Sequence, residues 1–374
     1  MVTAAAAVAA VGTVAGLVSA LDAHRGDDGT ARPTVSPVPS LAPLPAVPSR
    51  TPTADPPSLS RSSATPEPGP TKPTATRPAP VTRMPAPVGL YRYGGSQVLD
   101  WVRAHPSDPR RPLIESRIAA RPAAVWFADF APDTLASRVR AVTSGAARAG
   151  RVPVVVAYAI PQRDCGGASD GGAPDIGAYD DWIDRFAAGL GTREVIVILE
   201  PDALSQTDCL SGSQRADRYA ALARAGRVMK TANPRARVYY DAGHSDWNPA
   251  GTQAARLRAA GAAAPASSDG VFTNVSNFNR TDDEIAYARR MLTAMGAPDS
   301  LGAVIDTSRN GNGAAPGGAW CDPDGRGIGQ PPTLTTGRPR IDAYLWVKLP
   351  GESDGCKGEP GTFVPGYAYE LAKG

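Results

Sequence analysis

Residues 194–202 read Glu-Val-Ile-Val-Ile-Leu-Glu-Pro-Asp. The run 195–199 is continuously apolar rather than alternating, which is typical of a strand that is covered on both faces, as in a parallel sheet. Glu200 and Asp202 follow directly, so two carboxyl groups stand where this strand ends. The stretch therefore predicts a buried parallel strand that carries acidic side chains at its carboxyl end.

Six further short apolar runs accompany this strand, and Ala/Arg-rich segments with helical spacing lie between them, such as 134–149, 214–231 and 282–295. A strand followed by a helix, repeated seven times, predicts a distorted, seven-stranded, TIM-like parallel β/α barrel. The predicted strands are 124–130, 152–160, 194–200, 236–241, 270–277, 303–306 and 343–348.

The 374-residue chain has three parts of different composition. Residues 1–29 begin with an uncharged apolar run, which predicts either a cleaved signal peptide or an N-terminal membrane anchor. Residues 30–87 contain 17 of the 38 prolines and predict a disordered Pro/Ser/Thr-rich linker. Residues 88–374 are expected to form one catalytic domain. Both interpretations of the N-terminus predict export, so the protein is expected to be secreted or anchored at the cell surface.

Charge and cysteine content narrow the classes of function. The formal net charge is +3 and the basic residues are scattered, which argues against a nucleic-acid partner. The four cysteines form no CxxC pair and the chain has only three histidines, so neither a metal nor a cofactor is expected. In an exported protein an even cysteine count predicts two disulfides, for which the sequence allows three pairings; free buried thiols are the alternative. The cysteines are Cys165, Cys209, Cys321 and Cys356.

Every predicted strand ends in a polar or aromatic cluster. Since β/α barrels carry their catalytic groups at the carboxyl ends of the strands, these side chains are expected to face a common cleft. The clusters are Trp126 with Asp129, Tyr158 with Arg163 and Asp164, Glu200 with Asp202, Asp241 with His244, Asn274 with Asn277, residues 306–310 and residues 348–354.

The aspartates in these clusters fit the cleavage of a glycosidic bond. That reaction needs a carboxylic acid to protonate the leaving oxygen and a carboxylate that acts on the other face of the sugar ring. Asp202 would be half-desolvated at the end of a buried strand, which raises the pKa of its carboxyl group. A neighbouring anion, Asp164 or Asp241, would raise that pKa further. Asp202 is therefore the predicted general acid.

Seven segments together resemble family 6 of the glycoside hydrolases, and within it the bacterial endo-β-1,4-glucanases, or cellulases. They stand in the family's order, and the resemblance runs from about Tyr91 to Tyr369, leaving residues 1–87 outside it. The Leu-Glu-Pro-Asp element is moderately specific alone, whereas the ordered set is very specific. The segments are 158–165, 198–204, 240–244, 273–277, 305–313, 320–323 and 346–355.

The resemblance implies a role for each of five catalytic residues. Asp202 is the proton donor and Asp354 the base, reached through neighbouring substrate-binding side chains. Asp164 supports the pKa of the acid and lines the path of the attacking water. Tyr158 lies beneath the scissile sugar and favours a distorted ring. Arg163 pairs with a carboxylate and holds it ionised.

The resemblance also implies the substrate-binding residues. Three tryptophans are stacking platforms for sugar rings, His244 donates to a sugar hydroxyl, and Asp241 is a second neighbour of the acid. The remaining polar residues bind hydroxyl groups. The full set is Trp126, Asp241, His244, Trp247, Asn277, Trp320, Lys348 and Glu352. In the loop 166–172, an aspartate stands where the family often has a small polar residue of the water relay. Either Ser169 takes that role, or Asp170 adds an acid near the active centre.

By the same resemblance, Cys165 pairs with Cys209 and Cys321 with Cys356, which would brace the catalytic loops. The expected function is hydrolysis of β-1,4-glucan with inversion, by a monomer. An endo-acting enzyme is expected because the short stretch 337–341 leaves little room for a tunnel-forming insertion. The alternatives are a cellobiohydrolase of the same family, an enzyme for another β-glucan, and a glucan-binding protein without catalysis.

Overall fold

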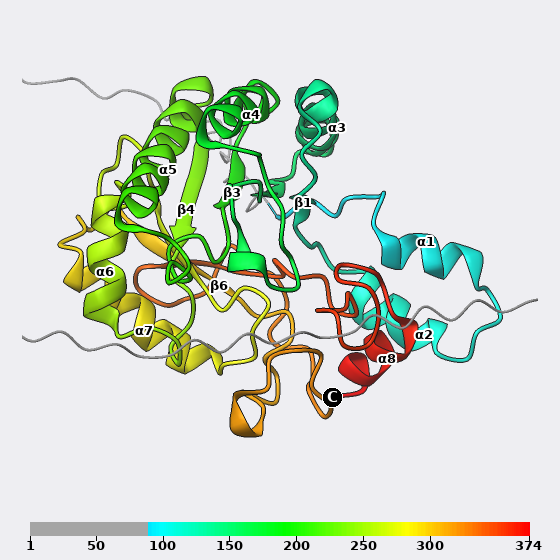
Figure 1. Ribbon diagram of the computed structural model, residues 1–374. Helices are drawn as coiled ribbons and strands as arrows, with labels where there is room; N and C mark the ends of the chain where they lie inside the picture. The colour runs from blue at the N-terminus through cyan, green and yellow to red at the C-terminus, as the bar shows by residue number, and fades with distance from the viewer. Residues whose placement is uncertain (1–88) are drawn as a thin grey trace, which may run out of the picture. The chain divides into compact units, whose positions relative to one another are not determined.

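The computed structural model describes residues 89–374, so the predictions for residues 1–29 and for the linker lie outside the described part (Figure 1). Seven strands form one parallel sheet in the order β1 to β7, as predicted for a distorted barrel. The strands are β1 (Val125–Phe127), β2 (Val154–Ala157), β3 (Val195–Leu199), β4 (Ala236–Asp241), β5 (Gly270–Thr273), β6 (Gly302–Asp306) and β7 (Ile341–Leu345).

Five helices connect consecutive strands from β1 to β6 (Figure 1). The three helices predicted from periodicity are confirmed as α3, α5 and α7. The prediction of a helix after every strand is wrong between β6 and β7, where only a 3₁₀ turn (Pro316–Gly318) occurs, because this segment is rich in glycine and proline. The helices are α3 (Pro132–Ala149), α4 (Ile176–Ala188), α5 (Gly212–Ala232), α6 (Ala250–Ala259) and α7 (Thr281–Ala294).

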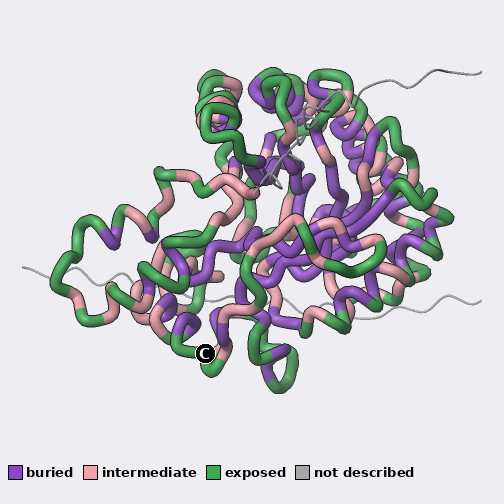
Figure 2. Tube along the Cα trace, turned by 180° about the vertical axis from the view of Figure 1, so that it is seen from behind, coloured by how far each residue is buried: buried purple, intermediate pink, exposed green. Residues whose placement is uncertain are grey.

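Both faces of the sheet are buried, as the continuous apolar runs predict. In β3, Val197 points to the helix layer, where it belongs to the same core cluster as Trp182 of α4 and Leu222 of α5. Its neighbour Ile198 points into the barrel interior, in a cluster with Tyr239 and other strand residues. Figure 2 shows the result: buried strands run through the centre, and exposed residues gather on the outer faces of the helices.

The two edge strands of the sheet, β1 and β7, face each other across a narrow seam. No ladder joins these two strands within residues 89–374, and one backbone hydrogen bond, from Ala124 N to Trp346 O (2.9 Å), links them. The indole of Trp126 adds a second link by donating to Val347 O (2.7 Å). The sheet is therefore curled rather than fully closed.

The β7 side of the seam is covered by the two ends of the described chain. Helices α1 (Gln97–Ala104), α2 (Arg111–Ile114) and α8 (Pro365–Lys373) lie together in Figure 1. Val98, Trp346 and Ala368 belong to one apolar cluster there. No helix within residues 89–374 has the length and apolar character needed to cross a membrane.

Candidate active site

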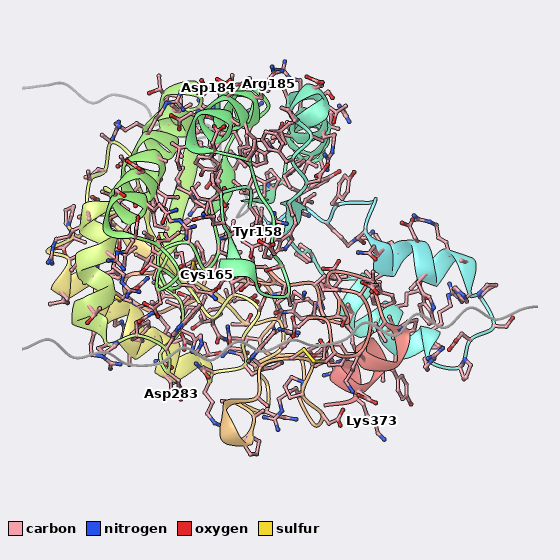
Figure 3. All side chains as sticks on the ribbon, viewed as in Figure 1. Tyr158, Cys165, Asp184, Arg185, Asp283 and Lys373 are labelled. Carbon is pink, nitrogen blue, oxygen red and sulfur yellow. A yellow bond between two sulfur atoms is a disulfide. The ribbon has the colours of Figure 1, made fainter. Side chains whose placement is uncertain are left out.

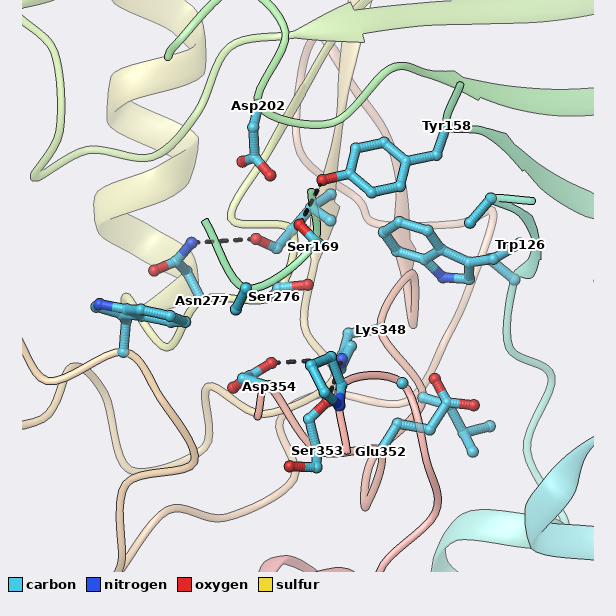
Figure 4. Close-up of a pocket in the computed structure, with 18 of the residues that line it drawn as sticks. Trp126, Tyr158, Ser169, Asp202, Ser276, Asn277, Lys348, Glu352, Ser353 and Asp354 are labelled. Carbon is cyan, nitrogen blue, oxygen red and sulfur yellow. Dashed lines mark hydrogen bonds and ion pairs between the residues drawn. The ribbon is translucent and has the colours of Figure 1, made fainter. Parts of the chain in front are cut away.

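A cavity of about 1050 Å³ lies at the carboxyl ends of the strands. Twelve of the thirteen predicted catalytic and substrate-binding residues line it, and only Asp241 does not. In the close-up, Asp202 and Asp354 lie on opposite sides of the cavity, with Tyr158 and Ser169 beside the first and Lys348 beside the second (Figure 4). The twelve are Trp126, Tyr158, Arg163, Asp164, Asp202, His244, Trp247, Asn277, Trp320, Lys348, Glu352 and Asp354.

Asp202 reaches the cavity through a sharp turn after β3. Glu200 (φ 50°) and Asp202 (φ 68°) both adopt left-handed backbone conformations, which are uncommon for residues other than glycine. Burial raises the pKa of the Asp202 carboxyl, and the nearby carboxylates of Asp241 and Asp164 raise it further. The group therefore keeps its proton at a pH where an ordinary aspartate has lost it, which is the state that a general acid needs.

Asp241 lies behind the cavity rather than among the residues that line it, and its role in binding substrate stays a prediction. The residue is buried, and its Oδ2 accepts hydrogen bonds from Leu204 N (3.1 Å) and Ser205 N (2.9 Å). Its Oδ1 accepts from Gly243 N (2.8 Å). The carboxylate thus faces main-chain donors rather than a ligand. Asp241 is also a neighbour of the acid, as expected, because its charge raises the pKa of Asp202.

Tyr158, Ser169 and Asp164 form a hydrogen-bonded chain along one wall. Ser169 Oγ donates to Asp164 Oδ2 (3.0 Å), so the Tyr158 hydroxyl is the donor in its 2.8 Å contact with Ser169 Oγ. Ser169 N also donates to Asp164 Oδ2 (2.8 Å). Asp170 lines the cavity too, but its carboxylate accepts from Gly171 N in its own loop. Of the two residues considered for this position, the structure places Ser169 between Tyr158 and Asp164.

Arg163 binds main-chain carbonyls in this structure, and its pairing with a carboxylate stays a prediction. Its Nε donates to Ser169 O (2.7 Å), and its Nη1 donates to the carbonyls of Ala128 and Tyr158. Its guanidinium carbon lies 4.5 Å from the centre of the Tyr158 ring. Carbonyl oxygens of two strand ends and one loop converge there and match the several donors of one guanidinium. Arg163 therefore fixes the loop and the tyrosine ring.

Two cations and a backbone N–H surround Asp354 on the opposite wall. Arg309 Nη1 lies 2.7 Å from its Oδ2, and Lys348 Nζ lies 3.3 Å from its Oδ1. The backbone N–H of Asp322 donates to Oδ2 (3.2 Å). The Arg309 guanidinium is fully buried and stacks on Phe278, 4.4 Å from the ring centre. The contacts fix the direction in which the carboxylate faces the cavity.

Arg309 and Asp322 were not predicted as site residues, although both lie in segments of the family resemblance. Arg309 was visible as the one basic residue in the cluster 306–310. Asp322 gave no such signal, because its partners lie more than thirty positions away. Its carboxylate accepts hydrogen bonds from the Ser353 hydroxyl and from the backbone N–H groups of Asp354, Cys356 and Lys357.

Glu352 is held by a residue from the other end of the domain. Burial raises the pKa of its carboxyl group to about 7, against the opposing effect of Lys348 and Arg309. Gln97 Nε2, in the first turn of α1, donates to Glu352 Oε1 (3.3 Å) and to Gly361 O (2.7 Å). Gln97 therefore joins α1 to the loop after β7. Gln97 was not predicted as a site residue either, because nothing in its local sequence distinguishes it.

The predicted sugar platforms are accessible. Trp247 and Trp320 are 37% and 55% exposed, unusually high for such large apolar side chains. Trp126 packs edge-on against Tyr158, with ring centres 5.4 Å apart. Their position in the cavity fits indoles that stack on the apolar faces of sugar rings.

His244 presents a donor to the cavity. Asn279 Nδ2 lies 2.9 Å from His244 Nδ1, and an amide N–H donates, so Nδ1 accepts and the ring proton is on Nε2. Burial lowers the pKa of His244, which keeps the ring neutral. No group of acidic, histidine and cysteine residues within 89–374 has the arrangement of a metal site.

Two disulfides brace the loops on either side of the cavity, with the pairing that the resemblance implied. Cys165, labelled in Figure 3, is bonded to Cys209 and joins the loop of Asp164 to the loop after β3. Cys321 is bonded to Cys356 and joins the segment of Trp320 to the loop of Asp354.

Reduction of the two disulfides is expected to loosen the catalytic loops before the barrel itself. On heating, the reduced protein should therefore lose activity at a temperature below its own thermal midpoint of unfolding. The bonds close loops of 44 and 35 residues, for which a stabilisation of about 2–4 kcal/mol each is typical. Activity and the thermal midpoint are measured with and without reductant, with Cys321→Ser/Cys356→Ser as the variant that lacks one bridge. Four free thiols in the unreduced protein, found by mass spectrometry, would contradict the expectation.

Comparisons with known proteins identify the family of the chain. The sequence pattern of Glycosyl hydrolases family 6 matches residues 93–366. Endoglucanase 1 of Streptomyces sp. (strain KSM-9) is 50% identical over 302 residues, covering 80% of this chain and 82% of the relative. Endoglucanase A of Thermobispora bispora is 52% identical over 278 residues, covering 74% of this chain and 60% of the relative.

Among solved structures, the endoglucanase Cel6 from Mycobacterium tuberculosis is similar, with a TM-score of 0.71 and 40% identity. The alignment covers 77% of this chain and 97% of that one. That structure contains a bound methyl-cellobiosyl-4-deoxy-4-thio-β-D-cellobioside. The fold, the carboxyl groups on opposite walls and these similarities lead to one conclusion: the chain belongs to family 6 of the glycosyl hydrolases.

Proposed function

We propose that the protein is an endo-β-1,4-glucanase that hydrolyses cellulose or a related β-glucan with inversion of the anomeric configuration. The observation that carries the proposal is the pair of carboxyl groups on opposite walls of one cavity. Asp202 has a raised pKa and suits a proton donor, whereas Asp354 is held by two cations. The two relatives that are 50% and 52% identical over the aligned residues are both named endoglucanases.

In this mechanism the glucan chain lies along the cavity with its rings on Trp126, Trp247 and Trp320. Asp202 donates its proton to the glycosidic oxygen as the bond breaks, and a water molecule attacks the anomeric carbon from the opposite face. The rate is expected to fall as the pH rises through the pKa of Asp202, since only the protonated acid is active.

Asp354 accepts the proton of the attacking water. Its Oδ1 contacts Lys348 Nζ and keeps a lone pair for a water molecule, while Arg309 holds Oδ2. On the other wall, the Ser169 hydroxyl and Asp164 offer hydrogen-bond partners to the same water. Tyr158 lies between Trp126 and Asp202, where it supports a distorted sugar ring.

The first product is expected to be the α-anomer. An inverting site leaves room for water, with carboxyl groups roughly 6.5–9.5 Å apart, whereas a retaining site holds a nucleophile about 5–5.5 Å from the acid. Proton NMR of cello-oligosaccharide hydrolysis, recorded before mutarotation, distinguishes the two. If the β-anomer appears first, the proposed inverting mechanism is wrong.

Endo action is tested on a soluble cellulose derivative by comparing the fall in viscosity with the release of reducing ends. Internal cutting lowers viscosity early, whereas a cellobiohydrolase releases reducing ends with little change in viscosity. A protein that binds the polymer but releases no reducing ends would be a glucan-binding protein. The same assay on a panel of β-glucans ranks the substrates.

We place this activity outside the cell, in a monomer that is either secreted or held at the surface by residues 2–20. The support is the apolar N-terminal run and the presence of two disulfides, which are typical of exported proteins. Fractionation of producing cells and size-exclusion chromatography test the two parts of this placement.

A further inference from the structure

Two charged side chains are buried behind the cavity without lining it. Glu200 is 0% exposed and Arg218, on the inner face of α5, is 2% exposed. Burying a charged group is costly unless hydrogen bonds replace its water, and apolar residues of the same size would often give an equally stable fold. The contacts of these two residues therefore indicate what they are for.

Both side chains tie together the two catalytic segments that follow β2 and β3. Glu200 belongs to the segment after β3 and binds main-chain N–H groups of the other, whereas Arg218 binds main-chain carbonyls of both. The contacts are Ala159 N to Glu200 Oε2 (2.9 Å), Ile160 N to Oε2 (3.0 Å), and Arg218 to the carbonyls of Pro161 (2.7 Å), Gln162 (3.1 Å), Ala203 (3.3 Å) and Gln206 (3.3 Å).

The sheet itself does not fix these segments. The last backbone bond between the ends of β2 and β3 runs from Glu200 N to Ala157 O (2.8 Å), and beyond it the two segments leave the sheet. One of them carries Tyr158 and Asp164, and the other carries Asp202. The two segments therefore need interactions other than the hydrogen bonds of the sheet to hold them in place.

The backbone of these segments is also strained. Nine residues other than glycine have positive φ angles within 89–374, and five of them lie here: Gln162, Asp164, Cys165, Glu200 and Asp202. Such conformations are unfavourable and persist only where the surroundings hold them. Glu200 and Arg218 supply six of the contacts that do so.

We propose that Glu200 and Arg218 form a buried clamp that sets the position of Asp202 relative to Tyr158 and Asp164. The inference rests on the proposed role of Asp202 as the acid, and both members of the clamp are positioning residues. Since burial and the nearness of Asp164 raise the pKa of Asp202, a loosened clamp should lower that pKa as well as the rate.

The test compares Glu200→Gln, Arg218→Lys and Arg218→Met with a control on the same helix, Arg224→Met. Arg224 binds Asp180 and Asp184 of α4 and does not contact the two segments. A lysine keeps the charge of Arg218 but lacks the planar fork that binds several carbonyls, so it should not rescue function. The measurements are the thermal midpoint, the kcat and KM on a cello-oligosaccharide over a range of pH, and the affinity for that oligosaccharide at low temperature.

In the clamp variants, kcat is expected to fall about tenfold or more, since a misplacement near 1 Å can cost about 100-fold. KM and affinity should stay within about threefold, because the groups that contact sugar remain. The alkaline limb of the pH profile should move to lower pH by about half a unit to one unit, the direction expected when the acid is less desolvated. Arg224→Met should change only the thermal midpoint.

The proposal is overturned if the clamp variants lose thermal stability, as the control does, but keep the wild-type kcat and pH profile per folded molecule. If Arg218→Met does not fold, Arg218→Lys and Glu200→Gln decide the question. Failure of the proposed function gives a different result: Asp202→Asn would then remain active, whatever the clamp variants do. An inactive Asp202→Asn with clamp variants like the control contradicts the clamp alone.

Discussion

Asp202→Asn is expected to abolish hydrolysis of unmodified glucan while the protein still folds and binds cello-oligosaccharides. An amide cannot donate the proton that the leaving oxygen needs, and general acid catalysis typically contributes about 10²–10⁴-fold. Folding should be nearly unchanged, because the carboxyl is already held in its uncharged form by burial and by Asp241 and Asp164. A reducing-sugar assay and calorimetric titration with cellotetraose measure the two effects.

Asp208→Asn is the matched control for this variant. Asp208 is an exposed aspartate in the same loop after β3, it does not line the cavity, and it should keep wild-type activity. Activity above about a tenth of wild type in Asp202→Asn would rule out Asp202 as the general acid, since that loss is smaller than the effect of removing such a group.

Arg309→Met is expected to lose both stability and activity. The guanidinium is fully buried and lies 2.7 Å from the Asp354 carboxylate, so its removal takes away one of the two cations of this buried anion and leaves only Lys348. Breaking a buried ion pair from one side typically lowers the free energy of unfolding by about 3–5 kcal/mol. Denaturant unfolding measures this loss, and kcat measures the effect of an Asp354 that is no longer held in place.

The double variant Arg309→Met/Asp354→Asn distinguishes two causes of destabilisation. One is the loss of the ion pair, and the other is the loss of packing where the arginine side chain was. If the destabilisation comes from the Asp354 carboxylate that has lost Arg309, removing its charge should restore part of the stability. The effects of the two single substitutions on the free energy of unfolding should then not add. An Arg309→Met protein that unfolds at the wild-type denaturant concentration would show that the ion pair contributes little.

Local sequence patterns predicted which segments become strands but not where their ladders stop. The predicted strand 152–160 is continuously apolar, yet β2 ends at Ala157 because Ala159 N and Ile160 N bond to the Glu200 side chain. Likewise the prediction 270–277 ends at Thr273, where Asn274 turns with φ 68°. A hydrogen-bond partner from another segment decides both boundaries, and no pattern within the strand itself records it.

In the site, too, local features could be predicted from the sequence, whereas contacts between distant segments could not. Asp202 could be predicted because a carboxyl group at the end of a buried strand is a local feature. The partners of Arg163 and Asp241 could not, since both residues bind main-chain groups, which every residue has and which no sequence motif marks. Arg309 and Asp322 act on Asp354 from other loops, and only the fold brings those loops together.

The order of the strands in the sheet has a consequence for how the protein folds during its synthesis. Because β1 to β7 stand in the sheet in the order in which they are translated, each new strand meets a neighbour that has already been made. The last of them carries Val347, the seam partner of Trp126, and then Lys348, Glu352 and Asp354. A nascent chain can therefore assemble most of its core while one wall of the cavity is still missing. Catalytic competence is expected only after β7 and the loop that carries Asp354 have been synthesised and have joined the sheet.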